Sequence, residues 1–312
     1  HNDAGKLDSV GHLDDGSRPE EVVHGSLEDG FPSTVSLGVA YLFSACTGNL
    51  ITPNLVLTAG HCGGDLPLKT IVAFGTANFG STIKEPDESI NFVNLTVHPD
   101  YKPLQSGLMG SLGKYDFAIL ELEWEASVQP LWFNTTELTE DEVGLELTSV
   151  GFGVNELGES GIKRSAELTI DEITKMFVVS RNEGNTGGAN ICSGDSGGPM
   201  FYFDGEQHTQ WAVHSWADEN CQDSSGSTRT DVASDWILEQ IEAVHGTTDR
   251  CEINGHYDNG VCDEFCDDID PDCIDDVEEE TPRACGCTSS GGKGAWIILV
   301  LAALGWRHRR IR

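Results

Sequence analysis

A serine, a histidine and an aspartate each stand in a short, distinctive string of this chain. The serine is Ser196, within the segment Cys192-Ser193-Gly194-Asp195-Ser196-Gly197-Gly198-Pro199. Glycines let backbone N–H groups approach a ligand without a Cβ in the way. A serine held there can attack a carbonyl carbon, and neighbouring N–H groups can hold the oxyanion that forms. The segment therefore predicts acyl-transfer chemistry at Ser196.

The histidine and the aspartate supply what such a serine needs. His61 ends the string Leu57-Thr58-Ala59-Gly60-His61, and histidine is the natural general base for a hydroxyl near neutral pH. Asp116 heads an apolar segment, 117–122, and a buried carboxylate there can fix the tautomer of a histidine ring. Either residue alone is more often structural, although each is of a type that a catalytic serine requires.

The three strings, in the order His61, Asp116, Ser196, resemble those of trypsin-like (chymotrypsin-fold) serine proteases. The resemblance runs from residue 22 to about 245 and includes the segments 150–153 and 215–216. It implies an endopeptidase that works through an acyl-enzyme, with the N–H groups of Gly194 and Ser196 as the oxyanion hole. It requires no cofactor.

The resemblance also implies activation by cleavage and two disulfides. A new α-amino group at Val22 would pair with the carboxylate of Asp195 and shape the oxyanion hole. The residues before Val22 are two glutamates, so an activating protease of trypsin-like specificity is not expected. The implied disulfides are Cys46–Cys62 and Cys192–Cys221.

The primary substrate pocket is implied by position in the same family. Asn190 stands at its base, where true trypsins carry an aspartate, so the sequence favours uncharged substrate side chains over basic ones. The other implied pocket residues are Ser215, Trp216, Ala217 and Gly226, of which the serine supports Asp116 and the glycine keeps the pocket open.

Composition sets the compartment and excludes one class of partner. The net charge of −34 repels phosphates, which excludes nucleic-acid binding. The 10 cysteines indicate an oxidising, extracytoplasmic compartment. We therefore expect a secreted protein whose partners are protein or peptide substrates.

Short apolar runs broken by glycine, proline and asparagine fill residues 35–240 and predict an all-β body. Helical periodicity occurs at 235–244. With the resemblance, this gives two six-stranded antiparallel β-barrels and a C-terminal helix. The expected divisions are a pro-segment or disordered region (1–21), a peptidase domain (22–246), a Cys/Asp-rich module with an acidic linker (247–283) and a tail (284–312).

The Cys/Asp-rich module has four cysteines between residues 251 and 273. It is open to three interpretations: a disulfide-stapled spacer, a calcium site or, less favoured outside the cell, a zinc site. The candidate calcium ligands are Asp258, Asp263, Asp267 and Asp270.

The tail combines Cys285-Gly286-Cys287, an apolar run at 295–306 and an arginine cluster. The run is shorter than the roughly 20 residues that span a bilayer comfortably. The layout resembles sorting tails of the MYXO-CTERM type and, less closely, the GlyGly-CTERM type. This implies a Gram-negative cell surface, a tail-processing system, and membrane contact through the tail alone.

Two other functions are compatible with this sequence. A catalytically inactive, protease-like protein could serve binding or adhesion at the cell surface, although such proteins usually lack a triad residue. An esterase would use the same three side chains.

Overall fold

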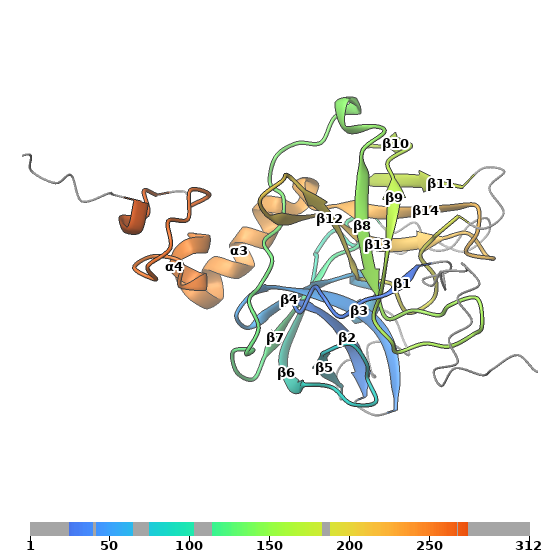
Figure 1. Cartoon of the computed structure of the whole chain (residues 1–312), viewed down its shortest axis with the longest axis horizontal. Helices are drawn as coiled ribbons and strands as arrows, with labels where there is room; N and C mark the ends of the chain where they lie inside the picture. Colours follow the sequence, from blue (N-terminus) through green and yellow to red (C-terminus); the bar gives the residue numbers. More distant parts are fainter. Residues whose placement is uncertain are drawn as a thin grey trace, which may run out of the picture. The chain divides into compact units, whose positions relative to one another are not determined.

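The computed structural model describes residues 25–39, 42–64, 75–102, 114–182, 188–266 and 268–273 (Figure 1). The chain divides into two units, His1–Cys273 and Ile274–Arg312. The expected pro-segment, the Val22 terminus and the sorting tail lie outside the described residues. Among the residues described, none of the helices has the length and apolar character to cross a membrane.

Six antiparallel strands close into the first barrel, in the order β2-β3-β4-β7-β6-β5 (Figure 1). Their bounds are β2 Thr34–Val39, β3 Phe43–Thr52, β4 Leu55–Thr58, β5 Thr76–Phe79, β6 Glu88–Val97 and β7 Ala118–Leu122. The interior holds a continuous apolar core that includes Leu37, Leu50 and Leu57, all fully buried. The barrel matters for function because Thr58, at the end of β4, pairs with Ala118, at the start of β7.

The second sheet has eight strands in the order β1-β9-β8-β12-β13-β14-β11-β10. Their bounds are β1 Ser26–Leu27, β8 Glu146–Gly151, β9 Arg164–Thr169, β10 Glu172–Ile173, β11 Phe177–Arg181, β12 Pro199–Phe203, β13 His208–Ala217 and β14 Ser224–Arg229. A separate apolar core lies under this sheet.

This second sheet corrects the prediction of two closed six-stranded barrels. The strands β9 and β11 would have to pair with each other to close it. Instead, the short strand β1 pairs with the free edge of β9, and β10 pairs with the free edge of β11. Each short strand pairs with two residues of its neighbour, and no ladder joins β9 to β11 among the described strands.

The helical segments are few and short, apart from the one after β14. They are α1 Gly60–Gly64, η1 Glu140–Glu142, η2 Asp231–Ala233, α3 Ser234–His245, α4 Arg250–Asn254 and η3 Pro271–Cys273. Helix α3 confirms the predicted C-terminal helix. Its Ile237 and Ile241 are four residues apart and pack into the core of the first barrel, and Gly246 ends it in the left-handed conformation.

The Cys/Asp-rich module is held by two disulfides, Cys251–Cys266 and Cys262–Cys273. Asp249 caps α4 by accepting the N–H groups of Cys251 and Glu252. The module reaches the main body through Ile253, which packs against the core of the first barrel. So short a segment has little core of its own, and the cross-links supply its rigidity.

Candidate active site

His61 and Asp116 form a two-point contact at one end of the first barrel. The Nδ1 atom of His61 lies 2.8 Å from Asp116 Oδ2, and the His61 backbone N–H donates to Oδ1 at 2.8 Å. The Ser215 hydroxyl donates to Oδ2 at 2.6 Å, and Asp116 is fully buried. An ionised carboxylate can only accept, so Nδ1 carries the proton and Nε2 is left as a proton acceptor.

The strand register explains why these two residues meet. Since Thr58 and Ala118 are paired at adjoining strand ends, the residues after β4 and before β7 emerge side by side. Gly60 makes the approach possible, because a Cβ there would come within 3.0 Å of the Phe117 nitrogen and the Tyr101 ring. The Thr-Ala-Gly-His string is thus a packing requirement as well as a chemical one.

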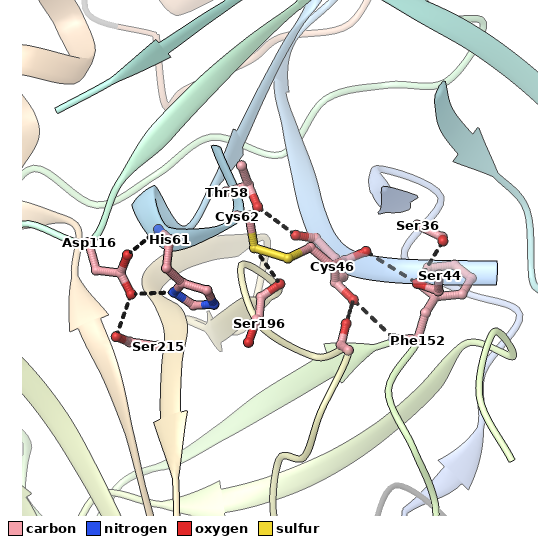
Figure 2. Close-up of a disulfide and its surroundings, with 12 residues drawn as sticks. Ser36, Ser44, Cys46, Thr58, His61, Cys62, Asp116, Phe152, Ser196 and Ser215 are labelled. Atoms are coloured by element: carbon pink, nitrogen blue, oxygen red, sulfur yellow. Dashed lines mark hydrogen bonds and ion pairs between the residues drawn. A yellow bond between two sulfur atoms is a disulfide. The ribbon is translucent and has the colours of Figure 1, made fainter. Parts of the chain in front are cut away.

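The Ser196 loop comes from the second sheet and is bound to the first barrel through β3. The Thr47 N–H donates to the Ser196 carbonyl oxygen at 2.8 Å, and the Thr47 hydroxyl donates to that of Gly194 at 2.8 Å. Gly194 and Gly197 have φ values of 99° and 85°, which favour glycine. Figure 2 shows the His61 ring between Asp116 and Ser196.

The backbone around Ser196 leaves two donors available. Among the described residues, neither the Gly194 N–H nor the Ser196 N–H donates to an acceptor, whereas the N–H groups of Asp195, Gly197 and Gly198 all do. Backbone donors beside a nucleophile can stabilise an oxyanion. The resemblance implies this role for Gly194 and Ser196, and the role stays a prediction.

Two disulfides lie at this site, pairing Cys46 with Cys62 and Cys192 with Cys221. The sulfur atoms of Cys46 and Cys62 and a ring nitrogen of His61 all lie within 4.8 Å of one another. They do not make a metal site, because both sulfurs are bonded to each other and neither can become a thiolate. The Cys46–Cys62 bridge instead holds α1, and with it His61, against β3.

Asp195 is a buried carboxylate in the nucleophile loop, only 2% exposed. Its two oxygens accept the N–H groups of Gly153 at 2.8 Å and Cys192 at 2.9 Å. No basic group of the described residues forms an ion pair with it. Burial raises the pKa of Asp195 to about 6, against the smaller opposing effects of those two hydrogen bonds and of Arg164. The loop therefore contains a buried acid whose ionised form is disfavoured by burial, with no ion pair to a basic side chain of the described residues.

Two glycines make room for this carboxylate. A Cβ at Gly151 would lie 2.0 Å from Asp195 Oδ1, and one at Gly153 would lie 2.5 Å from the carboxyl carbon and from Oδ2. The Gly-Phe-Gly segment thus leaves the space that the Asp195 carboxylate occupies.

Strand β1 is joined to the strand that leads to the Asp195 site through β9. Ser26 of β1 pairs with Ser165, which itself pairs with Val150 of β8, three residues before Gly153. The buried Lys163 ammonium donates to the carbonyl oxygen of Phe31 at 2.9 Å, and burial lowers the pKa of this group to about 8. Val22 lies four residues before Ser26, a reach of roughly 13 Å for extended chain.

The predicted pocket residues have distinct environments. Asn190 is 1% exposed, and its Oδ1 accepts the Ile191 N–H. Ser215 is engaged with Asp116, and Ala217 packs against the second core. Gly226 leaves room for the Trp216 indole, because Nε1 of that ring lies 2.2 Å from where a Cβ would stand.

Sequence reasoning missed a buried polar trio under the nucleophile loop. His214 of β13 lies 2.8 Å from the Ser149 hydroxyl through Nε2 and 2.9 Å from the Ser227 hydroxyl through Nδ1. Burial lowers the pKa of His214 to about 3, so the ring is neutral. Its backbone bonds both Gly197 and Gly198. No sequence motif marks these three residues. They meet only because Ser149, His214 and Ser227 lie in strands of the same sheet.

Two of the four candidate calcium ligands, Asp263 and Asp270, are engaged in hydrogen bonds. Asp270 accepts the N–H groups of Asp263 and Asp272, and Asp263 contacts His256 Nδ1 at 3.0 Å. Among the described residues of the module, no three acidic groups converge closely enough to share an ion. Asp267 lies outside the described residues, and calcium binding stays a prediction.

A family model and several curated proteins are similar to this chain. The family model described as "Trypsin" matches residues 24–237. CLIP domain-containing serine protease B10 of Anopheles gambiae is 27% identical over 231 residues, 63% of this chain and 61% of that protein. Phenoloxidase-activating enzyme of Bombyx mori is 26% identical over 220 residues, covering 56% and 48%.

A third relative is named as an inhibitor, whereas the first two are named as a protease and an enzyme. Glucanase inhibitor protein 2 of Phytophthora infestans is 26% identical over 207 residues, 62% of this chain and 77% of that protein. The chain spans about half the length of several curated relatives that it matches.

Proposed function

This chain belongs to the trypsin family, and on that premise we propose that it is a secreted or surface-attached serine endopeptidase. The observation that carries the proposal is the contact of His61 with the buried Asp116, beside the Ser196 loop with its two free N–H donors. The geometry supports a Ser-His-Asp triad whose base is already in the correct tautomer.

The reaction proceeds in two halves. Ser196 Oγ attacks the carbonyl carbon of a peptide bond while His61 Nε2 takes its proton. Asp116 stabilises the imidazolium, and the N–H groups of Gly194 and Ser196 hold the oxyanion. His61 then gives the proton to the leaving amine. Water repeats the sequence on the acyl-enzyme and frees Ser196.

Asp195 supports a switch for this activity. Cleavage before Val22 would create an ammonium group that can pair with the buried carboxylate, which lacks such a partner among the described residues. The pairing would lock the loop that carries Ser196 and the oxyanion donors. The partners are thus protein or peptide substrates and an activating protease.

Location is the part of the proposal that rests on sequence alone. The cysteine usage supports an oxidising compartment, and the 284–312 segment supports delivery to a Gram-negative cell surface by a tail-processing system. The name of the Bombyx mori relative describes an enzyme that activates another protein, and a comparable role in protein processing is open to this chain.

A second candidate is a protease-like binding protein without activity. The name of the Phytophthora infestans relative describes an inhibitor, which favours considering this class. Against it stands the complete set of His61, Asp116 and Ser196, with the ring contact intact.

Hydrolysis of a mixed peptide library separates the two. Chain cleaved before Val22 should release new amino termini from the library, and Ser196→Ala should release none. If the cleaved wild-type chain leaves the library intact, the endopeptidase proposal fails and the proposal of an inactive binding protein takes its place. Cleavage of esters but not of peptides would assign an esterase.

A further inference from the structure

Two N–H donors in the predicted substrate pocket are buried without an acceptor. Neither Asn190 Nδ2 nor Trp216 Nε1 has a hydrogen-bond partner among the described residues, and both atoms are inaccessible to solvent. The Thr228 hydroxyl, in the same strand as Gly226 and on the same face, is also without a partner. A buried donor left unpaired is costly, so this wall of the site lacks an acceptor that a ligand can supply.

Both donors are tied to the Ser196 loop. Ala189 accepts a hydrogen bond from Asn182 Nδ2 at 2.7 Å, and Cys192 is bridged to Cys221, so the segment holding Asn190 is fixed at both ends. Trp216 directly follows Ser215, whose hydroxyl holds Asp116. The segments that carry the two side chains are therefore held to the elements that carry the catalytic residues.

The chemistry of these donors selects the substrate side chain. A lysine or arginine would bring only further donors, and an apolar side chain would leave both N–H groups unpaired. A carboxylate brings two acceptor oxygens, and hydrogen bonds to an ionised acceptor are the stronger ones. The net charge of −34 opposes an anion only weakly at this range, because exposed charges are screened beyond about 8 Å at physiological salt.

The chain itself presents such a side chain at its predicted activation site. The residues before Val22 are Glu20 and Glu21, where the family's activators usually find a basic residue. We propose that the pocket of Asn190 and Trp216 binds a glutamate side chain, and that mature enzyme cleaves the Glu21–Val22 bond of other copies. This inference rests on the proposed function and adds to it a substrate class and a route of activation. It replaces the broader expectation of an uncharged side chain.

The processing step is an ordinary hydrolysis. Ser196 Oγ bonds to the carbonyl carbon of Glu21, the bond to the Val22 nitrogen breaks, and His61 delivers a proton to that nitrogen. Water then splits the Glu21 ester, which returns a hydrogen to Ser196 and leaves a carboxylic acid on the released peptide. The new Val22 ammonium is the group that Asp195 lacks.

The test uses full-length chain in which a recognition site for an unrelated processing protease replaces Glu20 and Glu21. Cutting there frees Val22 without help from the chain's own pocket. A fluorophosphonate probe then reports whether Ser196 reacts, independently of substrate side chains. A series of peptides that differ only in the residue before the scissile bond reports the preference.

We expect the highest kcat/KM after glutamate. Asn190→Ala should lower it about 10- to 100-fold for that substrate, and Asn190→Asp should lower it further through charge repulsion. Asn220→Asp is the matched control, because it adds the same charge at an exposed position of the neighbouring β13–β14 connection and should keep the preference. If the probe labels Ser196 but the peptide series shows a preference for glutamine, aromatic or basic residues, the inference alone is overturned. If the probe does not label Ser196, the proposed function is overturned.

Self-processing is tested with uncleaved Ser196→Ala chain as the substrate of mature enzyme. The Glu21–Val22 bond should be cut, Glu21→Ala should slow the cut at least 10-fold, and Glu20→Ala should leave it near the original rate. Equal cutting of the Glu21→Ala chain at the same bond would contradict self-processing.

Discussion

Replacing Asp195 by asparagine in uncleaved chain should change its stability in a way that depends on pH. Since burial raises the folded-state pKa of Asp195 to about 6 and the ordinary value is 3.8, the folded chain keeps, between these two pH values, a proton that the unfolded chain has lost. Stability contributed by this group therefore falls as pH rises from about 4 to about 6. The asparagine chain has no such titration.

The size of the effect follows from the shift. A difference of two pKa units corresponds to about 3 kcal/mol at full titration. Over the accessible interval from pH 4 to pH 7, the stability of the Asp195 chain should fall by about 2 kcal/mol relative to the Asp195→Asn chain. The asparagine oxygen can satisfy only one of the two backbone N–H groups of Gly153 and Cys192, but that cost does not depend on pH.

The assay is urea unfolding of both chains at several pH values, in a Ser196→Ala background that blocks self-processing. After cleavage before Val22, the new ammonium should lower the pKa of Asp195 and reverse the slope, so that the Asp195 chain gains relative stability as pH rises. A difference between the uncleaved chains that stays constant from pH 4 to pH 7 would refute the reasoning about the unpaired carboxylate.

The remaining predictions concern the triad, its support and the module. Asp116→Asn should lower kcat of the cleaved chain about 10⁴-fold in steady-state kinetics, and near-normal turnover would contradict the role of Asp116. The rate should fall as the pH is lowered, because a protonated His61 cannot act as the base, whereas a profile flat to pH 5 would exclude His61 as the base. Thr47→Val leaves the Gly194 carbonyl and the buried Phe152 N–H without the Thr47 hydroxyl and should lower the free energy of unfolding by about 1 to 3 kcal/mol in urea, against little change if the loop tolerates the loss. Dithiothreitol should unfold the 251–273 module in hydrogen exchange; sensitivity to EDTA instead would assign its stability to calcium.

The fold was predictable where short motifs and strand patterns carry it. Glycine and apolar runs placed the first barrel and helix α3, because alternating burial and helical spacing are local signals. The open second sheet was not, since β1 and β10 are two-residue strands whose pairing with β9 and β11 depends on distant edges. Nothing in the segments 26–27 and 172–173 marks them as strands.

The candidate site shows the same division. His61, Asp116 and Ser196 stand in short local motifs that can be recognised in the sequence. The β4–β7 register then brings His61 and Asp116 together. The contact of Trp216 with Gly226 and the buried polar group around His214 could not be predicted from the sequence, because each depends on cross-strand neighbours far apart in the chain. The unpaired state of Asn190 Nδ2 is likewise a property of packing.

Labelling of Ser196 by a fluorophosphonate probe, located by peptide mapping in chain cleaved before Val22, tests the central claim most directly. We expect one label per molecule on the peptide that contains Ser196, far slower labelling of uncleaved chain, and none in Ser196→Ala. Cleaved chain that takes up no probe, or takes it up equally well without Ser196, would contradict the account.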